Sequence, residues 1–195
     1  MITIGVTGSL GTGKSFVASV FRSLGAKVLD ADSMAHESLK KGTPTYRKIV
    51  KTFGRAILKS SGDIDRKRLA ERVFVNRSAL VKLNSIIHPD VIRRIKYITG
   101  KAPIDKAVVI DAPLLVEAGL AGMVDILIVV KASRKNQYCR SQKKLGIGKE
   151  ECERRLKNQM ALSKKVKMAD FVIRNDGTKG QTRKQVRQIW GKLWK

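Results

Sequence analysis

The chain has 195 residues, of which 43% are hydrophobic and 29% charged, as expected for one folded domain with a small insertion. It contains no run of about 20 apolar residues and opens directly on a strand pattern, so we expect no signal peptide, no membrane partner and a cytoplasmic location. The formal net charge of +25 favours anionic partners. Because the basic residues are dispersed and aromatic residues make up only 5%, we expect mostly solvated surface and no specific nucleic-acid partner.

The first motif is residues 8–15, GSLGTGKS, which fits G-x-x-x-x-G-K-[ST]. It follows the apolar run 2–6 and opens a helical pattern at Lys14, which is the context of a phosphate-binding loop. Glycines let several backbone N–H groups approach phosphate oxygens together. They recur at Gly8, Gly11 and Gly13. The alternative is a glycine-rich turn without a ligand.

The residues that end this loop carry the chemistry of a nucleotide site. We expect Lys14 to reach the β- and γ-phosphates of ATP and the hydroxyl of Ser15 to coordinate Mg²⁺. The buried strand pattern 107–111 ends in Asp111, which resembles a Walker B carboxylate that holds the water shell of the same magnesium ion.

A second strand pattern, residues 27–32, ends in the carboxylates Asp30 and Asp32. Ligands of open parallel sheets bind beyond the carboxyl ends of the strands, which places both acids at the edge of the phosphate loop. If the backbone stays extended, both side chains point the same way. One can then take the proton of an attacking hydroxyl while the other orients it or holds magnesium water ligands. Capping of the following helix is the alternative for either acid.

From about residue 33 to residue 105 the pattern is wholly helical. A parallel crossover needs only about a dozen residues, so we expect an inserted helical domain over 35–105 that holds the acceptor substrate. One helix is predicted to end at His88, because Pro89 restricts it to extended geometry, and another to end at Gly100. His36 and His88 are too isolated to indicate a metal site, so each is expected to be structural or to face the substrate.

Two polar helices, 134–145 and 149–161, predict a hairpin between the last strands. We expect a lid over residues 133–167 that excludes water and directs Arg140 at the phosphates; a solvated charged helix pair is the alternative. The last helix is expected to bury five apolar residues. These are Val186, Ile189, Trp190, Leu193 and Trp194.

Together these patterns predict an α/β fold of three layers, the P-loop kinase fold, with a five-stranded parallel sheet. Its core is expected to comprise residues 1–34, 106–132 and 168–195, with the inserted helical substrate domain and the helical lid as additions.

The order of the motifs resembles the dephospho-CoA kinases along essentially the whole chain. The P-loop alone is shared by many NTPases, and more specific elements follow it. They are Asp30-Ala31-Asp32 with His36, Gly62-Asp63-Ile64-Asp65-Arg66, Ile87-His88-Pro89, Asp111-Ala112-Pro113-Leu114-Leu115 with Glu117, Gln137 with Arg140, Gln159, Lys165, Ala169-Asp170 and Asn175-Asp176-Gly177.

This resemblance implies ATP-dependent phosphorylation of the ribose 3′-hydroxyl of dephospho-coenzyme A, the last step of coenzyme A synthesis. Asp32 then resembles the base, and Lys14 and Arg140 the groups that stabilise the transferred charge. The implied ATP-binding residues are Gly8, Gly11, Thr12, Gly13, Lys14, Ser15, Phe16, Arg140, Asn175 and Gly177. The implied acceptor-binding residues are Asp32, His36, His88, Leu114 and Glu117.

Two residues depart from the family pattern. Lys144 stands where many relatives have a second lid arginine, and lysine cannot make the same bidentate phosphate contact. Phe16 replaces the usual small polar residue after the P-loop serine, which we expect to affect packing only.

The expected partners are ATP with Mg²⁺ and dephospho-CoA. The protein itself is expected to be a monomer. A different small-molecule or nucleotide kinase on the same core is an alternative. A nucleic-acid-stimulated P-loop ATPase is another alternative, motivated by the charge, although no nucleic-acid-binding motif is present.

Overall fold

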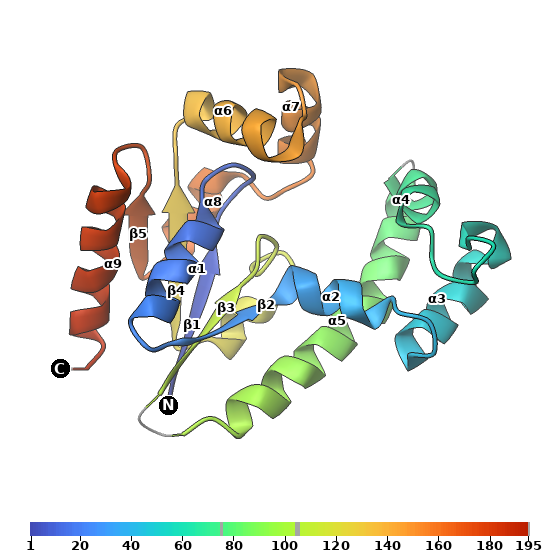
Figure 1. Cartoon of the computed structure of the whole chain (residues 1–195), viewed down its shortest axis with the longest axis horizontal. Coiled ribbons are helices and arrows are strands. Elements are labelled where there is room, and N and C mark those ends of the chain that lie inside the picture. Colours follow the sequence, from blue (N-terminus) through green and yellow to red (C-terminus); the bar gives the residue numbers. More distant parts are fainter. Residues whose placement is uncertain (75, 104–105, 195) are drawn as a thin grey trace. The chain divides into compact units, whose positions relative to one another are not determined.

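The computed structural model describes residues 1–74, 76–103 and 106–194 (Figure 1). The chain divides into two compact units, one of residues 1–30 and 101–195 and the other of residues 31–100. The expected end of the insertion at residue 105 lies outside the described residues. The functional division into core, acceptor domain and lid remains a prediction.

The first unit is built on a five-stranded sheet in which every strand pairs in parallel. The strands are β1 (Ile2–Thr7), β2 (Lys27–Asp30), β3 (Ala107–Asp111), β4 (Ile126–Lys131) and β5 (Phe171–Arg174). Their order is β2-β3-β1-β4-β5, so the strand before the phosphate loop is central. Asp30 and Asp111 are partners in the register of β2 and β3, which places both at the carboxyl edge. The predicted parallel sheet is confirmed.

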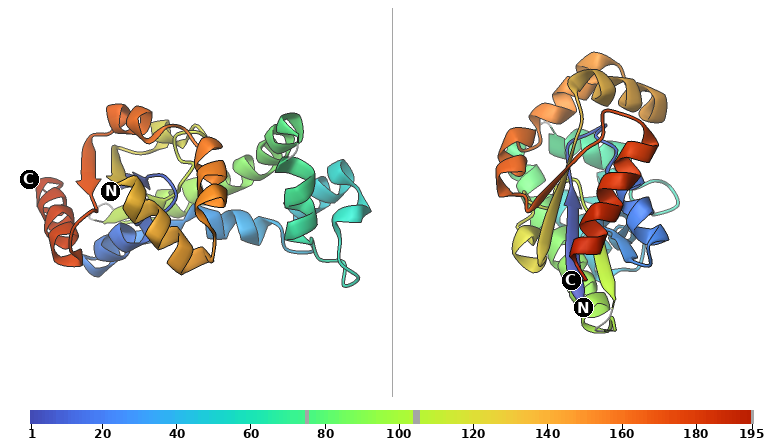
Figure 2. Two further views of the ribbon diagram at one scale, coloured as in Figure 1. Left: turned by 90° about the horizontal axis from the view of Figure 1, so that it is seen from above. Right: turned by 90° about the vertical axis from the view of Figure 1, so that its left-hand side faces the viewer.

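Successive side chains of β1 point to opposite faces of the sheet and pack against different layers of the first unit. Ile4 and Val6 join the core cluster formed with α1 (Lys14–Ser23) and α9 (Lys179–Lys192). Gly5 faces the other way, against Leu115 and Val124. Figure 2 shows α1 and α9 on one face of the sheet and α8 (Leu162–Met168) on the other. These three layers agree with the predicted fold class.

The helices after β4 differ in part from the prediction. The first, α6, spans Arg134–Leu145 as expected. The second was expected to run to residue 161, but α7 covers only Lys149–Lys157, and α8 is a separate helix. The physical reason is a competing partner, because the Met160 amide donates to the carboxylate of Glu117 at 3.0 Å.

The C-terminal helix α9 docks on the core, but its last tryptophan does not. Val186 and Ile189 are buried, and Trp190 and Leu193 are partly buried against the core. Trp194 was expected to be buried and is 44% exposed, so that prediction was wrong. Its indole meets Trp190 edge-on at 5.6 Å between ring centroids, at the helix end where the core no longer reaches it.

The regular secondary structure described for the second unit is helical, and Leu58 and Ile64 form an isolated bridge in the loop before α4. Its helices are α2 (Ala31–Ser38), α3 (Pro44–Phe53), α4 (Arg66–Phe74) and α5 (Arg77–Gly100). Two 3-10 turns, Arg55–Ile57 here and Leu120–Met123 in the first unit, complete the secondary structure of the described residues. None of the helices in these ranges combines the length and apolarity needed to cross a bilayer.

The expected helix end at His88 was wrong, because α5 continues through Pro89. A proline inside a helix removes one backbone hydrogen bond and strains the preceding turn. The buried stripe Ile87, Val91 and Ile95 spans the proline, so apolar burial on both sides keeps the helix continuous.

Candidate active site

The phosphate loop joins β1 to α1 in a conformation that depends on glycine. Gly11 and Gly13 have φ values of 74° and 89°, which side chains rarely adopt. A Cβ at Gly11 would overlap the backbone carbonyl of Gln137, and one at Gly13 would overlap the side-chain amide of Asn175. The loop can therefore lie directly against α6 and the segment after β5. Two loop amides are engaged within the protein, because Leu10 N donates to Gln159 Oε1 and Thr12 N to the Ser9 carbonyl, each at 3.2 Å. The amides of Gly13, Lys14 and Ser15, at the start of α1, supply donors for an anion.

The end of the loop brings a cation and a carboxylate together. Lys14 Nζ lies 3.8 Å from Asp111 Oδ1, and their side chains are only 14% and 11% exposed. Ser15 is exposed in the first turn of α1. Of the three residues, the Ser15 hydroxyl and the Asp111 carboxylate supply oxygens of the kind that Mg²⁺ prefers.

A magnesium ion at this point would take few ligands from the chain. Among residues 1–74, 76–103 and 106–194, no group of three or more His, Cys, Asp or Glu side chains could hold a metal ion. Mg²⁺ in nucleotide sites is held by one or two protein oxygens together with phosphates and water. Ser15 and Asp111 fit that requirement.

Arg140 of α6 bridges the phosphate loop and the segment after β5. Its Nη1 donates to the Thr12 carbonyl at 3.3 Å and its Nη2 to the Asn175 carbonyl at 2.7 Å. The side chain of Asn175, which is buried, donates to the same Thr12 carbonyl at 2.8 Å and accepts from the Thr182 hydroxyl at 2.8 Å. The expected residues Arg140 and Asn175 are thus held against the loop, with the guanidinium beside the anion site.

Asp176 fixes the start of α6. Its carboxylate accepts from the Ser133 amide at 2.6 Å and from Asn136 Nδ2 at 3.0 Å. The Ser133 amide, followed by Asn136 and the charge of Arg140, holds the pKa of Asp176 below its ordinary value. This anchor ties α6 to the segment that carries Asn175, and sequence reasoning did not identify it.

Two further ATP-binding candidates, Gly177 and Phe16, lie next to the last helix. Gly177 precedes the capping box of α9, in which Thr178 and Gln181 satisfy each other's backbone groups. A Cβ on Gly177 would overlap the amide oxygen of Gln181. The ring of Phe16 lies under Arg183 of α9, at 5.5 Å to the ring centroid, so the structure places this residue in the contact between α1 and α9.

A buried ion pair lies on the sheet face opposite α1. Lys165 is fully buried, and its Nζ is 2.7 Å from both the Pro113 carbonyl and Glu117 Oε1. Burial lowers the pKa of Lys165, and the contact with Glu117 opposes the shift. Lys165 is therefore an exception to the expectation that the basic residues are mostly solvated. The available signal was its position beside Leu162 and Val166 in the apolar stripe of α8.

Glu117 and Leu114 come from the segment that follows β3. Glu117 is occupied by Lys165 and by the Met160 amide, so it fixes the segment internally. Leu114, one residue after the carbonyl that Lys165 holds, is 38% exposed. An apolar side chain is therefore presented to solvent from a segment with fixed ends.

The remaining candidates belong to the second unit. β2 ends at Asp30 and α2 begins at Ala31, so Asp32 lies in the first turn of a helix. The expected extended pair of Asp30 and Asp32 was therefore wrong. Asp32 and His36 are four residues apart on α2, on one face, and both are exposed. His88 is half-buried on α5, where desolvation lowers its pKa.

Comparison of the chain with known proteins identifies its family. The model of the dephospho-CoA kinase (CoaE) family matches residues 2–181. Among curated proteins, a dephospho-CoA kinase of Aquifex aeolicus is 45% identical over 99% of this chain and 98% of its own length. One of Bacillus cereus is 41% identical over 96% and 95%.

Solved structures agree. TT1252 from Thermus thermophilus superposes with a TM-score of 0.86 at 29% identity, covering 98% of this chain and 97% of that one. A dephospho-CoA kinase from Campylobacter jejuni gives a TM-score of 0.69 at 28% identity, covering 98% and 96%. A shikimate kinase from Acinetobacter baumannii, at 14% identity, with a TM-score of 0.55 and coverage of 100% and 93%, shares the fold. The chain belongs to the dephospho-CoA kinase family.

Proposed function

We infer that this protein transfers the γ-phosphoryl group of ATP to the 3′-hydroxyl of dephospho-coenzyme A, giving coenzyme A and ADP. This reaction is the last step of coenzyme A biosynthesis. The observation that carries the inference is the family match over residues 2–181, which includes the phosphate loop, the helical insertion and the segment after β5.

The donor side of the reaction is assigned to the first unit. The N–H groups of the loop, Lys14 and the start of α1 bind the phosphates of ATP. Ser15 and Asp111 would hold Mg²⁺, which neutralises phosphate charge when it is bound. Arg140 stands beside the Thr12 carbonyl, from where a guanidinium can stabilise charge that develops on the transferred group.

The acceptor side is assigned to Asp32 and residues near it in the sequence. Asp32 follows Asp30 by two residues, and Asp30 is the register partner of Asp111 at the carboxyl edge of the sheet. We propose that the Asp32 carboxylate takes the proton of the 3′-hydroxyl as that oxygen attacks the γ-phosphorus. His36, His88 and the exposed Leu114 are proposed to contact the acceptor.

Glu117 is proposed to act on the acceptor through the segment that it fixes. Its carboxylate is held by Lys165 and the Met160 amide, and this arrangement supports the position of Leu114. The protein is further proposed to act as a magnesium-dependent monomer in the cytoplasm.

A substrate panel tests the proposed function. Purified protein with ATP and Mg²⁺ should release ADP with dephospho-CoA and should release at least 100-fold less with AMP, UMP or shikimate. Equal turnover on those acceptors would indicate another small-molecule kinase. ATP hydrolysis stimulated by polynucleotide, with steep salt dependence, would instead indicate a nucleic-acid-dependent ATPase.

A further inference from the structure

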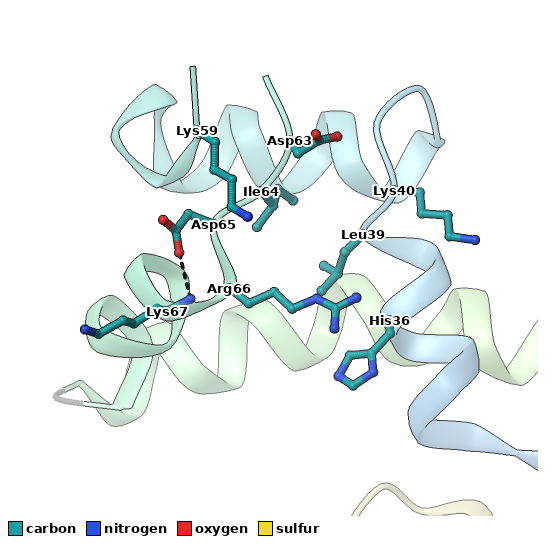
Figure 3. A pocket seen from close by; sticks show the side chains of 9 residues that line it. All are labelled: His36, Leu39, Lys40, Lys59, Asp63, Ile64, Asp65, Arg66 and Lys67. Carbon is teal, nitrogen blue, oxygen red and sulfur yellow. Dashed lines mark hydrogen bonds between the residues drawn. The ribbon is translucent and has the colours of Figure 1, made fainter. Parts of the chain in front are cut away.

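The helical insertion contains a cavity of about 560 Å³ whose lining is dominated by positive charge (Figure 3). It is formed by the end of α2, the turn before α4 and the start of α4. Four of its lining residues are cations and two are carboxylates. They are Lys40, Lys59, Arg66 and Lys67, with Asp63 and Asp65. Leu39 and Ile64 complete the apolar part of the lining.

Both carboxylates have hydrogen-bond partners close to them in the chain. Asp63 accepts from the Ser61 hydroxyl at 2.7 Å. Asp65 accepts from the first amides of α4, those of Lys67 and Arg68, and lies 3.6 Å from the guanidinium of Arg68. The Arg68 amide is the main reason that the pKa of Asp65 lies below its ordinary value. Asp65 therefore caps α4, and Asp63 is held by a neighbouring hydroxyl.

Of the cations, Lys59 acts electrostatically on Asp65 and helps to lower its pKa, although the two side chains form no ion pair. Within the described ranges, neither Arg66 nor Lys59 makes a side-chain hydrogen bond or an ion pair. Figure 3 shows the Arg66 guanidinium directed toward the His36 imidazole, with the Lys59 ammonium above them and the Asp63 carboxylate turned away. The guanidinium of Arg66, which pairs with no described carboxylate, and the nearby ammonium of Lys59, which is only partly offset by Asp65, form a site for a phosphorylated ligand beside Leu39 and Ile64.

The helix α2 gives this site a definite distance from the proposed base. Asp32 and His36 are one turn apart on the same face of α2, a separation of about 6 Å along the axis. In dephospho-CoA the diphosphate is attached to the 5′-carbon of the ribose that carries the reacting 3′-hydroxyl. A ribose with its hydroxyl at Asp32 thus presents its 5′-substituent about one helical turn away, on the scale that separates Asp32 from His36.

We propose that Arg66 and Lys59 bind the 5′-diphosphate of the acceptor, with His36 between that group and the ribose. This proposal rests on the proposed function. It makes the cavity a specificity site, because it distinguishes a nucleoside with a 5′-diphosphate from an unphosphorylated nucleoside that offers the same hydroxyl.

Steady-state kinetics with Arg66→Met and Lys59→Met test the assignment. Loss of one charge-assisted contact should raise KM for dephospho-CoA by about 10- to 100-fold. In both variants kcat and KM for ATP should stay within about twofold of wild type, and Arg66→Lys should recover part of the loss. The matched control is Lys48→Met, which removes an exposed charge of α3 outside the cavity and should change none of these values.

Inhibition by adenosine shows whether an effect on acceptor binding comes from the diphosphate or from the rest of the acceptor. Adenosine should inhibit wild type and Arg66→Met with the same inhibition constant, because it lacks the diphosphate. An equal loss for adenosine and dephospho-CoA would overturn the assignment, as would unchanged KM for dephospho-CoA in both variants. Wild-type protein that does not turn over dephospho-CoA would instead refute the proposed function. Thermal unfolding of each variant confirms that it is folded.

Discussion

Lys165 Nζ lies 2.7 Å from Glu117 Oε1, and the lysine is fully buried. The same ammonium donates to the Pro113 carbonyl, which also accepts from the hydroxyl of Thr7 at the end of β1. A cation from α8 therefore fixes the segment after β3 to the strand that leads into the phosphate loop.

Removing either member of this pair should destabilise the protein. Lys165→Met leaves the Glu117 carboxylate without its counter-charge, and loss of one partner of a buried pair costs about 3 kcal/mol. Glu117→Gln should cost at least as much, because it leaves the ammonium of Lys165, which is 0% exposed, without its counter-charge, whereas the carboxylate left by Lys165→Met keeps 20% exposure. The double variant should be more stable than the sum of the single losses predicts. Urea unfolding of all four proteins checks this, and strictly additive losses would show that the two side chains do not interact.

The glycine at position 13 should be indispensable for nucleotide binding. Gly13→Ala places a Cβ against Asn175 at a φ of 89°, so the loop must move and we expect at least about 10-fold weaker ATP binding. Gly148→Ala is the matched control, because Gly148 has a φ of −72° and open space around it. Calorimetric titration with ATP measures the dissociation constant for each variant. An affinity of Gly13→Ala equal to that of wild type would contradict the described packing.

Arg140 should not be replaceable by lysine. Its guanidinium donates to two carbonyls, those of Thr12 and Asn175, which an ammonium on a flexible stem cannot reproduce in the same geometry. We expect kcat to fall about 100-fold or more in Arg140→Met, and Arg140→Lys to recover only a small part. Stopped-flow or steady-state rates at saturating ATP test this. Wild-type kcat in Arg140→Lys would mean that the pair of hydrogen bonds from the planar guanidinium has no role.

The anchor at Asp176 should give the free energy of unfolding a defined pH dependence. Hydrogen bonds lower the folded-state pKa of Asp176 relative to the unfolded chain, so its contribution is present above the unfolded-state pKa, about 4, and is lost as pH falls through the folded-state pKa. Asp176→Ala should therefore lower the free energy of unfolding at pH 7, by about 1 kcal/mol or less because the site is exposed. The difference from wild type should shrink as the pH falls through the folded-state pKa. A difference that is independent of pH would show that the carboxylate charge does not contribute.

The sheet and the phosphate loop could be predicted from the sequence because their signals are local. Continuous β-branched runs give buried parallel strands, and the spacing from Gly8 to Ser15 gives the loop. The continuation of α5 through Pro89 could not be predicted locally, since burial of Ile87 and Val91 outweighs the preference of proline.

The site was harder to predict where a side chain has a long-range partner. Lys165 resembled its surface neighbours in the sequence, and its role depends on Pro113 and Glu117, about fifty residues away. The cavity around Arg66 likewise depends on the local engagement of Asp63 and Asp65, which charge counting cannot distinguish from neutralisation of the cations.

The most direct test of the account is the turnover of Asp32→Asn, because the mechanism assigns to this carboxylate the proton of the attacking hydroxyl. Asparagine keeps the shape and removes the base, so kcat with ATP and dephospho-CoA should fall by about 10²- to 10⁴-fold, while the dissociation constant for ATP stays at the wild-type value. Turnover within about threefold of wild type, with ATP binding intact, would contradict the account.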